Sequence, residues 1–383
     1  MRIGIDKIGF FVPPYYLEME DLAASRGVDP NKYRVGIGED QMAVNPVSQD
    51  IITFAANAAA EILEVRDLEA IDLLVVGTES SLDESKASAV VLHRLLGIQP
   101  FARSFEIKEA CYGATAGLLA ARDYVAAHPD RKALVVASDI ARYGLASGGE
   151  PTQGAGAVAI LISANPRLLA LGEDSVALTQ DIYDFWRPTG NRFPMVDGKL
   201  SNETYIGAFA QVWAEYRKRT GREFAAFAAL TFHLPYTKMG KKALLPLLAG
   251  SPEEARLLRQ YEAATVYNRR VGNLYTGSLY LSLISLLEQS KELTAGDRVG
   301  LFSYGSGSVA EFFSGELVDG FEQQLAVSRH EKLLEARIRL TIPEYEQMFE
   351  QLAGQTDFRS DKVPYSLEKI EGGVRYYKKS LSA

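Results

Sequence analysis

The chain contains a single cysteine, Cys111, in the stretch "EIKEACYGATAGLLAA" (106–121). Gly, Ala and Thr dominate the residues after it, so we expect a helix that packs closely against neighbouring backbone. A cysteine at the start of such a helix lies near the positive end of the helix dipole, which favours the thiolate. A buried cysteine acting as a small apolar side chain is the alternative. The position favours a nucleophile on a central helix.

A thiol nucleophile needs a base or a proton shuttle, and histidine is the usual one. The chain has four histidines. His93 lies in a helical pattern, whereas His128 and His330 lie in polar stretches and are expected to face solvent. His233 follows the apolar run "AALTF" and precedes "LPYTK", a strand end of the kind where α/β proteins place chemistry. His233 is therefore the candidate catalytic histidine.

A candidate acid or base, Glu79, closes another apolar run, "LLVVGTE". A carboxylate at this position could cap the helix that follows. It could instead project into a dry pocket, where its pKa would rise and allow proton exchange near neutral pH. The sequence leaves both alternatives open.

Three lysines, Lys238, Lys241 and Lys242, share one helical face in "YTKMGKKALLPLL". Such a face is usually solvated. Lysines in the first turns of a helix are repelled by the positive end of its dipole, however. A bound anion such as phosphate would offset this unfavourable electrostatic energy. A phosphate-binding face is the functional alternative.

The composition excludes several classes of protein. The net charge of -8 gives no general basic field for nucleic acid. No apolar run approaches the ~20 residues that span a bilayer, and the first residues lack a signal-peptide pattern. One cysteine excludes an internal disulfide and a four-cysteine zinc site. We expect a cytoplasmic protein without a metal site.

Short apolar runs alternate with helical patterns along most of the 383 residues. The runs at 72–79, 132–139 and 157–163 are typical of buried strands, and 49–63 and 84–97 show helical spacing. This alternation predicts an α/β fold in which helices cover the faces of a sheet.

Two glycine-rich runs suggest an internal repeat, since "GAGAVA" at 154–159 recurs as "GSGSVA" at 305–310. Neither run has the spacing of a dinucleotide or phosphate loop. We expect both to mark strands where two backbones approach closely. The strand that ends at Glu79 likewise has a counterpart that ends at His233.

The helix that opens at Cys111 corresponds to "NLYTGSLYLSLISLL", which opens at Asn273. With the strand ends and glycine runs, this predicts two related halves, 1–168 and 169–383. A pseudo-twofold axis between them would bring the thiol, the carboxylate, the imidazole and the amide toward one centre.

Seven motifs together resemble the hydroxymethylglutaryl-CoA synthase family, most closely its bacterial form. They are "EIKEACYGATAGL", "ALVVASDIARYG", "EPTQGAGAVAIL", "PMVDGKLSNETY", "FHLPYTKMGKKAL", "GNLYTGSLY" and "FSYGSGSVAEFF", and they span nearly the whole chain. The resemblance implies a thiolase fold, with two related halves in a five-layered αβαβα arrangement, usually as a homodimer. It also implies a place in the mevalonate pathway to isoprenoids.

The resemblance implies a reaction between two thioesters. Acetyl-CoA acylates the cysteine, the acetyl carbanion adds to the ketone of acetoacetyl-CoA, and hydrolysis frees the product. This chemistry requires an acyl carrier, a base and donors for a developing alkoxide, but no metal or redox cofactor.

Matching motifs assign roles to individual residues. Cys111 would be the acyl carrier, Glu79 the general acid/base, and His233 would position the acetoacetyl group. Gly148 departs from the asparagine of animal forms, which leaves the contact made there in doubt. The residues implied to bind CoA or the acyl groups are Asp29, Pro30, Tyr143, Thr152, Ser201, Lys238, Lys242, Asn273 and Ser306.

Two other functions remain open at this point. A type III ketoacyl synthase-like enzyme would use a Cys, His and Asn set, which Cys111, His233 and Asn273 could supply. A non-catalytic thiolase-fold subunit could bind acyl-CoA. Glu79 and the lysine-rich "TKMGKK" favour the synthase.

Overall fold

The central sheet contains ten strands, and most of them are buried on both faces. The computed structural model describes residues 1–351 and 363–380. One part of the sheet contains, in spatial order, β1 (Ile3–Phe11), β7 (Gly154–Ala164), β6 (Lys132–Ala141), β4 (Ile71–Gly77) and β5 (Arg103–Ile107). The other part continues from β1 through β8 (Leu169–Leu171), β14 (Val309–Leu317), β13 (Arg298–Gly305) and β12 (Ala229–Phe232), with β9 (Val176–Thr179) beside β14. The strands expected from the three apolar runs are confirmed as β4, β6 and β7.

Side chains alternate between the two faces of each strand, and this alternation creates the layers of the fold. On β4, Val75 faces the central core and Val76 faces an outer core. On β13, Leu301 joins the same central core and Phe302 joins a third core. The two parts of the sheet therefore each lie between two layers of helices.

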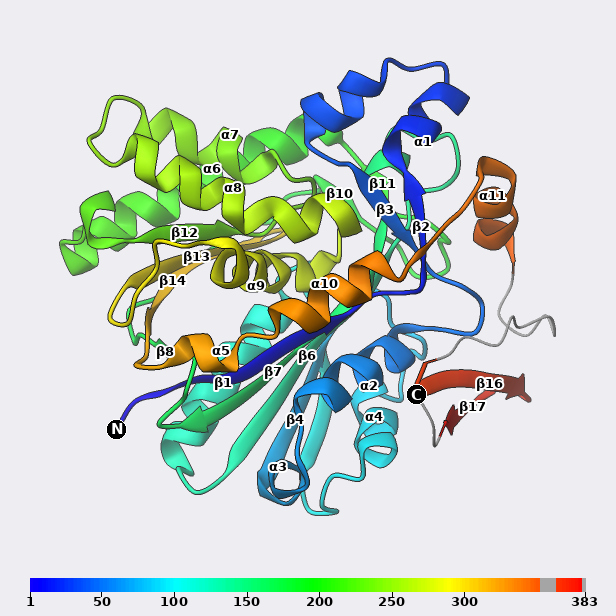
Figure 1. Ribbon diagram of the computed structural model, residues 1–383, viewed down its shortest axis with the longest axis horizontal. Helices are drawn as coiled ribbons and strands as arrows, with labels where there is room; N and C mark the ends of the chain where they lie inside the picture. The colour runs from blue at the N-terminus through cyan, green and yellow to red at the C-terminus, as the bar shows by residue number, and fades with distance from the viewer. Residues whose placement is uncertain (352–362, 381–383) are drawn as a thin grey trace.

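The helices form three layers. The central layer consists of α5 (Gly113–Ala127) and α9 (Ser278–Gln289), with α8 (Glu254–Val271) packed along α9. One outer layer consists of α2 (Ile51–Ile62), α4 (Ser88–Leu96) and the short α3 (Val65–Ala70), and the other of α6 (Gly198–Thr220) and α7 (Met239–Leu248). Figure 1 shows these outer layers on opposite sides of the molecule. The five-layered αβαβα arrangement is thereby confirmed.

The two parts of the sheet repeat one pairing pattern. β4 pairs parallel with β6, β6 pairs antiparallel with β7, and β7 pairs antiparallel with β1. In the same way, β12 pairs parallel with β13, β13 antiparallel with β14, and β14 antiparallel with β8. The internal repeat in the sequence is therefore a repeat of structure. The boundary between residues 168 and 169 stays a prediction.

The repeated glycine runs bring the two halves into close contact. A Cβ atom on Gly154 would lie 2.7 Å from the backbone nitrogen of Asn273, and one on Gly305 would lie 2.8 Å from the backbone nitrogen of Tyr112. Only glycine allows such an approach. Each run thus packs against the segment that precedes the central helix of the opposite half, which confirms the close approach expected for these strands.

The remaining elements form smaller units around the sheet. One unit with its own core contains β2 (Tyr15–Glu18), α1 (Met19–Ser25), the π-helix η1 (Lys32–Ile37), β3 (Gln41–Val44), β15 (Ile338–Arg339) and α11 (Ile342–Glu350). Two hairpins are β10 (Phe185–Trp186) with β11 (Met195–Val196) and β16 (Tyr365–Glu371) with β17 (Val374–Lys379). The others are α10 (Val327–Glu335) and the 3₁₀ turns η2 (Glu150–Thr152), η3 (Phe224–Ala226), η4 (Tyr275–Gly277) and η5 (Phe321–Gln324).

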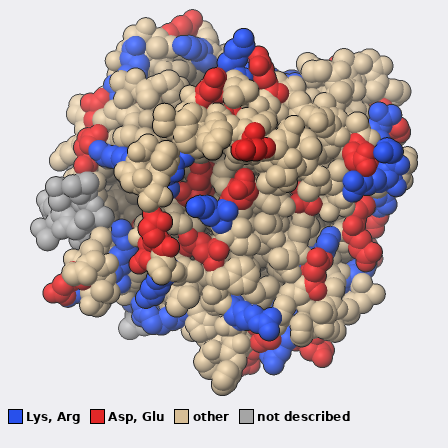
Figure 2. All heavy atoms as spheres, turned by 180° about the vertical axis from the view of Figure 1, so that it is seen from behind, with Lys and Arg blue, Asp and Glu red and all other residues tan. Residues whose placement is uncertain are grey.

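Charged side chains are interspersed over the surface drawn in Figure 2, where Lys and Arg do not gather into one broad basic area. This distribution agrees with the net charge of -8. Among the helices of the described residues, none is both long and apolar enough to cross a bilayer.

Candidate active site

Cys111 lies in the loop between β5 and α5 and borders a large cavity. Ala110, just before it, has a φ of 39°, in the left-handed region, so the chain turns sharply at this point. The helix after it packs tightly, because a Cβ atom on Gly77 would lie 2.4 Å from the backbone nitrogen of Ala114. The close packing expected from the small residues is confirmed. It holds the thiol at a fixed position on the cavity wall.

Glu79 follows β4 and is the carboxylate next to the thiol. The thiol of Cys111 donates a hydrogen bond to Oε2 of Glu79, with 3.6 Å between sulfur and oxygen. Burial, and after it the charge of Asp139, raises the pKa of Glu79 to about 8. Glu79 does not cap the helix that follows, because the N-cap of α4 is Ala87. The structure thus favours a carboxyl group that exchanges protons near neutral pH.

The thiol is not a resting thiolate, and the sequence-based expectation is wrong on this point. Burial, followed by the charges of Glu79 and Asp139, raises the pKa of Cys111 well above its ordinary value. Loss of hydration and repulsion by these carboxylates outweigh the nearby helix terminus. Removal of the proton from Cys111 therefore requires a base, and Glu79 is within reach.

Asp139, a buried residue in β6, organises the chain around Glu79 and was missed by the sequence analysis. Its Oδ1 atom accepts hydrogen bonds from the backbone N–H of Glu79 at 2.8 Å and from the hydroxyls of Thr78 and Ser80 at 3.0 and 2.9 Å. Its Oδ2 atom accepts the backbone N–H of Thr276 at 3.0 Å. Burial raises the pKa of Asp139 to about 6 although these donors oppose the shift. Its signal in the sequence is an acidic residue that ends the apolar run 132–139.

His233 directly follows β12 and lines the same cavity as Cys111. Burial lowers the pKa of His233 to about 3, so its ring is neutral at physiological pH. The Nδ1 atom is buried and has no hydrogen-bond partner among the residues that the structure describes. The hydroxyl of Tyr205 donates to the carbonyl oxygen of His233 at 2.6 Å and fixes the strand end. A neutral imidazole on the cavity wall can donate or accept a hydrogen bond with a polar ligand atom.

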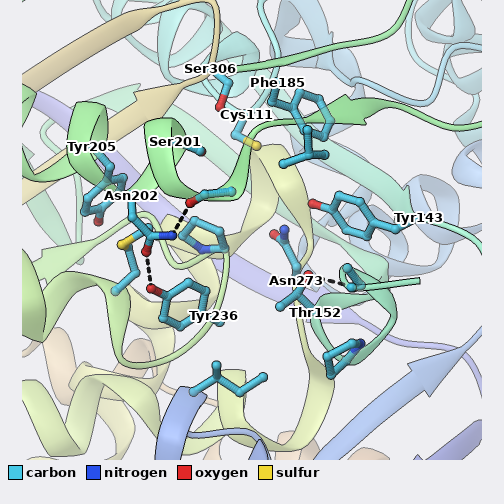
Figure 3. Close-up of a pocket in the computed structure, with 18 of the residues that line it drawn as sticks. Cys111, Tyr143, Thr152, Phe185, Ser201, Asn202, Tyr205, Tyr236, Asn273 and Ser306 are labelled. Atoms are coloured by element: carbon cyan, nitrogen blue, oxygen red, sulfur yellow. Dashed lines mark hydrogen bonds between the residues drawn. The ribbon is translucent and has the colours of Figure 1, made fainter. Parts of the chain in front are cut away.

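Asn273 lies on the cavity wall between α8 and η4. Its Oδ1 atom accepts the backbone N–H of Tyr275 at 2.8 Å and the hydroxyl of Ser278 at 2.9 Å. These bonds fix the orientation of the side chain, so the amide nitrogen stays available to the cavity. Figure 3 shows Asn273 on the same side of the cavity as Thr152 and Tyr143.

Three aromatic rings, Tyr143, Phe185 and Tyr275, form a partition beside Cys111. Their centroids lie 5.9 to 6.1 Å apart and the rings meet edge to face, a favourable arrangement for aromatic pairs. The sequence analysis singled out Tyr143 alone. Phe185 comes from the short hairpin strand β10 and Tyr275 from η4, so their convergence depends on connections that no periodic pattern reveals.

The cavity in front of Cys111 has a volume of about 700 Å³, within the usual size of a ligand site. In Figure 3, Cys111 and Ser306 lie at one end of the drawn residues and Tyr236 lies toward the other. The predicted binding residues that line it are Tyr143, Thr152, Ser201, Lys242, Asn273 and Ser306. The lining residues that were missed include Lys32, Tyr33, Ile37, Phe185, Asn202, Tyr205, Tyr236, Tyr275 and Tyr304. The wall is thus rich in tyrosine, a residue that combines an apolar ring with a polar end.

Three predicted binding residues, Asp29, Pro30 and Lys238, are not among the residues that line the cavity, although their neighbours Lys32 and Met239 are. The carboxylate of Asp29 accepts the backbone N–H of Asn31 at 2.9 Å and so shapes the turn before η1, whose residues do line the cavity. Lys238 is the N-cap residue of α7, and its aliphatic chain lies against Gly38.

The three lysines of "TKMGKK" lie in the first turns of α7, but their side chains have different partners. Lys241 is paired with Glu262 of α8 at 2.8 Å. Lys242 instead donates a hydrogen bond to the hydroxyl of Tyr236 at 2.8 Å, on the cavity wall. The backbone of Lys238 is already helical, and its carbonyl oxygen accepts the backbone N–H of Lys242 at 3.1 Å.

Gly148 leaves the wall open at the position where the animal forms have asparagine. No atom lies within 4 Å of the place where a Cβ atom would stand on Gly148. The space that a side chain would occupy at Gly148 is thus open in this protein.

The other histidines lie away from the cavity. His330 is buried, contrary to the expectation of a solvated side chain, with its Nδ1 atom 2.8 Å from Oε1 of Glu288 and its ring stacked on Phe10. His128 is exposed and His93 lies in α4. In the described part of the chain, no group of three or more His, Cys, Asp or Glu side chains could hold a metal ion.

Comparison with known proteins finds relatives along the whole chain. Residues 1–167 match the family described as hydroxymethylglutaryl-coenzyme A synthase N terminal, and residues 175–256 and 252–381 match the C-terminal family of the same enzyme. The chain is 65% identical to hydroxymethylglutaryl-CoA synthase of Enterococcus faecalis, over 99% of this chain and 100% of the relative.

Solved structures of the same kind superpose closely. A structure of HMG-CoA synthase complexed with CoA has a TM-score of 0.96 and 46% identity, covering 99% of this chain and 100% of that one. A structure of MvaS in complex with 3-hydroxy-3-methylglutaryl coenzyme A has a TM-score of 0.89 and 37% identity, covering 99% of both chains. Both matches extend over the two halves and the cavity between them.

Proposed function

The chain belongs to the hydroxymethylglutaryl-CoA synthase family and is an acyl-transferring condensing enzyme, and we propose that Cys111, Glu79 and His233 carry its reaction. The reaction joins acetyl-CoA, acetoacetyl-CoA and water to give hydroxymethylglutaryl-CoA and CoA. The observation that supports these roles is the 3.6 Å contact between Sγ of Cys111 and Oε2 of Glu79, next to a cavity that a neutral His233 also lines.

In the first step, the sulfur of Cys111 attacks the thioester carbonyl of acetyl-CoA. Because burial keeps the thiol protonated, its proton moves to the carboxylate of Glu79 as the carbon–sulfur bond forms. Glu79 then gives this proton to the departing CoA sulfur, which restores the carboxylate for the next step. A base in direct contact with the nucleophile is the usual arrangement for activating a weak nucleophile.

In the second step, Glu79 removes a proton from the methyl group of acetyl-Cys111, and the carbanion attacks the ketone of acetoacetyl-CoA. Glu79 then returns this proton to the resulting alkoxide, which gives the hydroxyl group and restores the carboxylate. The neutral ring of His233 donates a hydrogen bond to the ketone oxygen, where negative charge develops. The amide nitrogen of Asn273 is a second donor on the same wall. A carboxyl group with a pKa of about 8 can both lose and regain a proton near neutral pH.

The CoA portion lies toward the end of the cavity that Lys32 and Lys242 line, where two cations can bind phosphate. Thr152, Ser201 and Ser306 line the cavity and are proposed to contact the acyl groups. Asp29, Pro30 and Lys238 would act one layer further out, by shaping the segments that carry the lining residues. The reaction itself needs no metal or redox cofactor, because both substrates are thioesters and no oxidation state changes.

We place the reaction in the cytoplasm and in the mevalonate pathway to isoprenoids. The family assignment and the absence of an internal disulfide in a chain with one cysteine support this placement. Deletion of the gene in its host, with growth restored by added mevalonate, tests the pathway.

We also propose that β5 is the interface of a homodimer. It is the last strand of the sheet, and its outer edge has no partner strand among the described residues. Phe101 and Phe105 are 89% and 39% exposed beside this edge. An exposed strand edge with large apolar side chains favours pairing with a second chain. Light scattering should give twice the mass of one chain for the wild type and the mass of one chain for Phe105→Lys.

Intact mass spectrometry tests the proposed mechanism directly. Acetyl-CoA alone should add one acetyl group to the wild type and protect the thiol from iodoacetamide, and Cys111→Ser should abolish both effects. Addition of acetoacetyl-CoA should remove the acetyl group and release hydroxymethylglutaryl-CoA. Wild-type protein that remains unmodified would contradict the covalent mechanism and would favour the non-catalytic subunit.

A further inference from the structure

A second cavity lies beside Glu79, separate from the substrate cavity. Its volume is about 150 Å³, and its lining includes Glu79, Ser81, Arg142, Arg187 and Arg192. Ser81 and two of the arginines, Arg187 and Arg192, are exposed, so this cavity opens to solvent. It is named here the rear cavity.

The aromatic partition separates the rear cavity from the substrate cavity. Phe185, Pro194 and Tyr275 line both cavities. Cys111 borders only the substrate cavity, and Glu79 borders only the rear one. The 3.6 Å contact between thiol and carboxylate therefore crosses the partition, and Glu79 is the group that connects the two spaces.

The rear cavity is polar and carries excess positive charge. Arg192 is paired with Glu350 at 3.2 Å, whereas Arg187 donates to the backbone oxygen of Glu79 at 2.7 Å. Arg142 contacts an amide oxygen and an aromatic ring. Among the described residues, Arg142 and Arg187 thus have no carboxylate contact. Polar groups that are not paired with one another keep a cavity hydrated, and this one has room for several water molecules at about 30 Å³ each.

The last step of the proposed reaction creates a need for such a space, and the present inference rests on that reaction. Hydrolysis takes place while the condensed product is attached to Cys111 and its CoA arm fills the substrate cavity toward Lys32 and Lys242. Water then has no open path through that cavity. We propose that the rear cavity supplies the water that hydrolyses the acyl-enzyme, and that Glu79 activates it.

The step balances as follows. Glu79 takes a proton from the water molecule while the water oxygen bonds to the carbonyl carbon of the thioester. The bond between this carbon and Sγ of Cys111 then breaks, and the sulfur leaves with the proton returned by Glu79. The products are the free thiol and a carboxylic acid, which releases its proton to solvent.

Filling the rear cavity tests the proposal. Ile140 lines the rear cavity and not the substrate cavity, so Ile140→Phe narrows the rear cavity, and Ile140→Leu is the matched control of nearly equal volume. Acetyl-CoA should acetylate Cys111 equally in all three proteins. Isolated acetyl-enzyme should also lose its acetyl group at the same rate in all, because water enters through the empty substrate cavity. With both substrates, turnover of Ile140→Phe should fall at least about tenfold, and the condensed product should accumulate on Cys111 by intact mass.

Each other outcome contradicts the proposal. Normal turnover in Ile140→Phe without a condensed adduct would exclude the rear cavity as the water route. Slower loss of the acetyl group from isolated acetyl-enzyme of Ile140→Phe would contradict the proposal, because it would show that the variant impairs hydrolysis even when the substrate cavity is open to water. Accumulation of acetyl-enzyme in place of the condensed adduct would show that condensation, not hydrolysis, was impaired. Ser81→Phe at the exposed rim gives the same test if Ile140→Phe does not fold, and a wild type that forms no acetyl adduct refutes the proposed function itself.

Discussion

The contact between Cys111 and Glu79 shifts the pKa values of the two groups in opposite directions. Burial is the largest influence on both and raises both pKa values. The hydrogen bond from the thiol to the carboxylate then lowers the pKa of Glu79, whereas the charge of Glu79 raises that of Cys111. The proton therefore stays on sulfur until a substrate is bound, and the free enzyme should react more slowly with iodoacetamide at neutral pH than a thiolate would.

Replacement of the carboxylate separates these effects. Glu79→Gln should lower the pKa of Cys111, because a negative charge beside the sulfur is removed, while burial keeps that pKa above its ordinary value. The rate of alkylation by iodoacetamide should thus rise at a lower pH than in the wild type. Condensation should fall about 10²- to 10⁴-fold, as is typical for loss of a general acid or base. An unchanged alkylation profile, or near-normal turnover as a type III ketoacyl synthase would show, contradicts the assignment.

A second buried carboxyl group, Glu39, should make stability depend on pH. Its Oε1 atom accepts two hydrogen bonds from Thr237, and its Oε2 atom has no partner among the described residues. Burial raises the pKa of Glu39 to about 8 from 4.5. The folded chain therefore binds more protons between these values, and its stability falls as the pH rises through this window.

Glu39→Gln should abolish the fall in folding stability at high pH. Its amide oxygen keeps the bonds from Thr237, and no proton is lost at high pH. We expect a melting temperature about 2–4 °C above that of the wild type at pH 9, and no gain at pH 5. The exposed Glu335→Gln should change neither value. An equal gain at both pH values would show that ionisation of Glu39 is not the cause.

The two neighbouring lysines of α7 give a matched pair for CoA binding. Lys242→Ala should raise KM for the CoA substrates about tenfold, with kcat nearly unchanged, because a phosphate contact is equally strong in the ground and transition states. Lys241→Ala should leave both constants unchanged, since Lys241 is paired with Glu262 away from the cavity. Steady-state kinetics in which the two variants behave alike would refute this difference in role.

The close approach at Gly305 can be tested in the same way. A Cβ atom there would meet the backbone of Glu109 at 2.6 Å and of Tyr112 at 2.8 Å, so Gly305→Ala should cost about 1–3 kcal/mol of stability. It should also slow acetylation, because the displaced segment carries Cys111. Gly148→Ala meets no atom within 4 Å and should be neutral in both respects. Denaturant unfolding compares the stability of the two variants, and the rate of acetylation by acetyl-CoA compares the reactivity of their Cys111.

Much of the architecture could be predicted because its determinants are local. The strands β4, β6 and β7 are apolar runs buried on both faces, and the small residues after Cys111 indicate the tight packing of α5. The repeat then relates Glu79 to His233 across the fold. These features need only periodicity and composition.

The rest of the site depends on convergence between distant segments. The pKa of Cys111 is raised by burial, then by Glu79 and then by Asp139, a residue of β6 that holds the backbone of Glu79. The partition is closed by Phe185 from a two-residue strand, which has no periodic signal. Likewise, Lys241 and Lys242 are adjacent in α7, yet Lys241 pairs with Glu262 of α8 and Lys242 bonds to Tyr236 on the cavity wall, which depends on the segments that pack around the helix.

The reciprocal glycine contacts give the two halves the same backbone geometry, although their functional side chains differ. Gly154 of one half packs against the backbone at Asn273, and Gly305 of the other half packs against the backbone before α5. Each half therefore fixes the position of the loop that precedes the central helix of the other half. The backbone frame is thereby held symmetric while the side chains on it are free to differ. The first half carries the thiol and the carboxyl group of the proposed reaction. The second half carries the neutral imidazole and the amide that are proposed to bind the substrate. This division of labour lets one symmetric scaffold treat two similar thioesters as unequal partners.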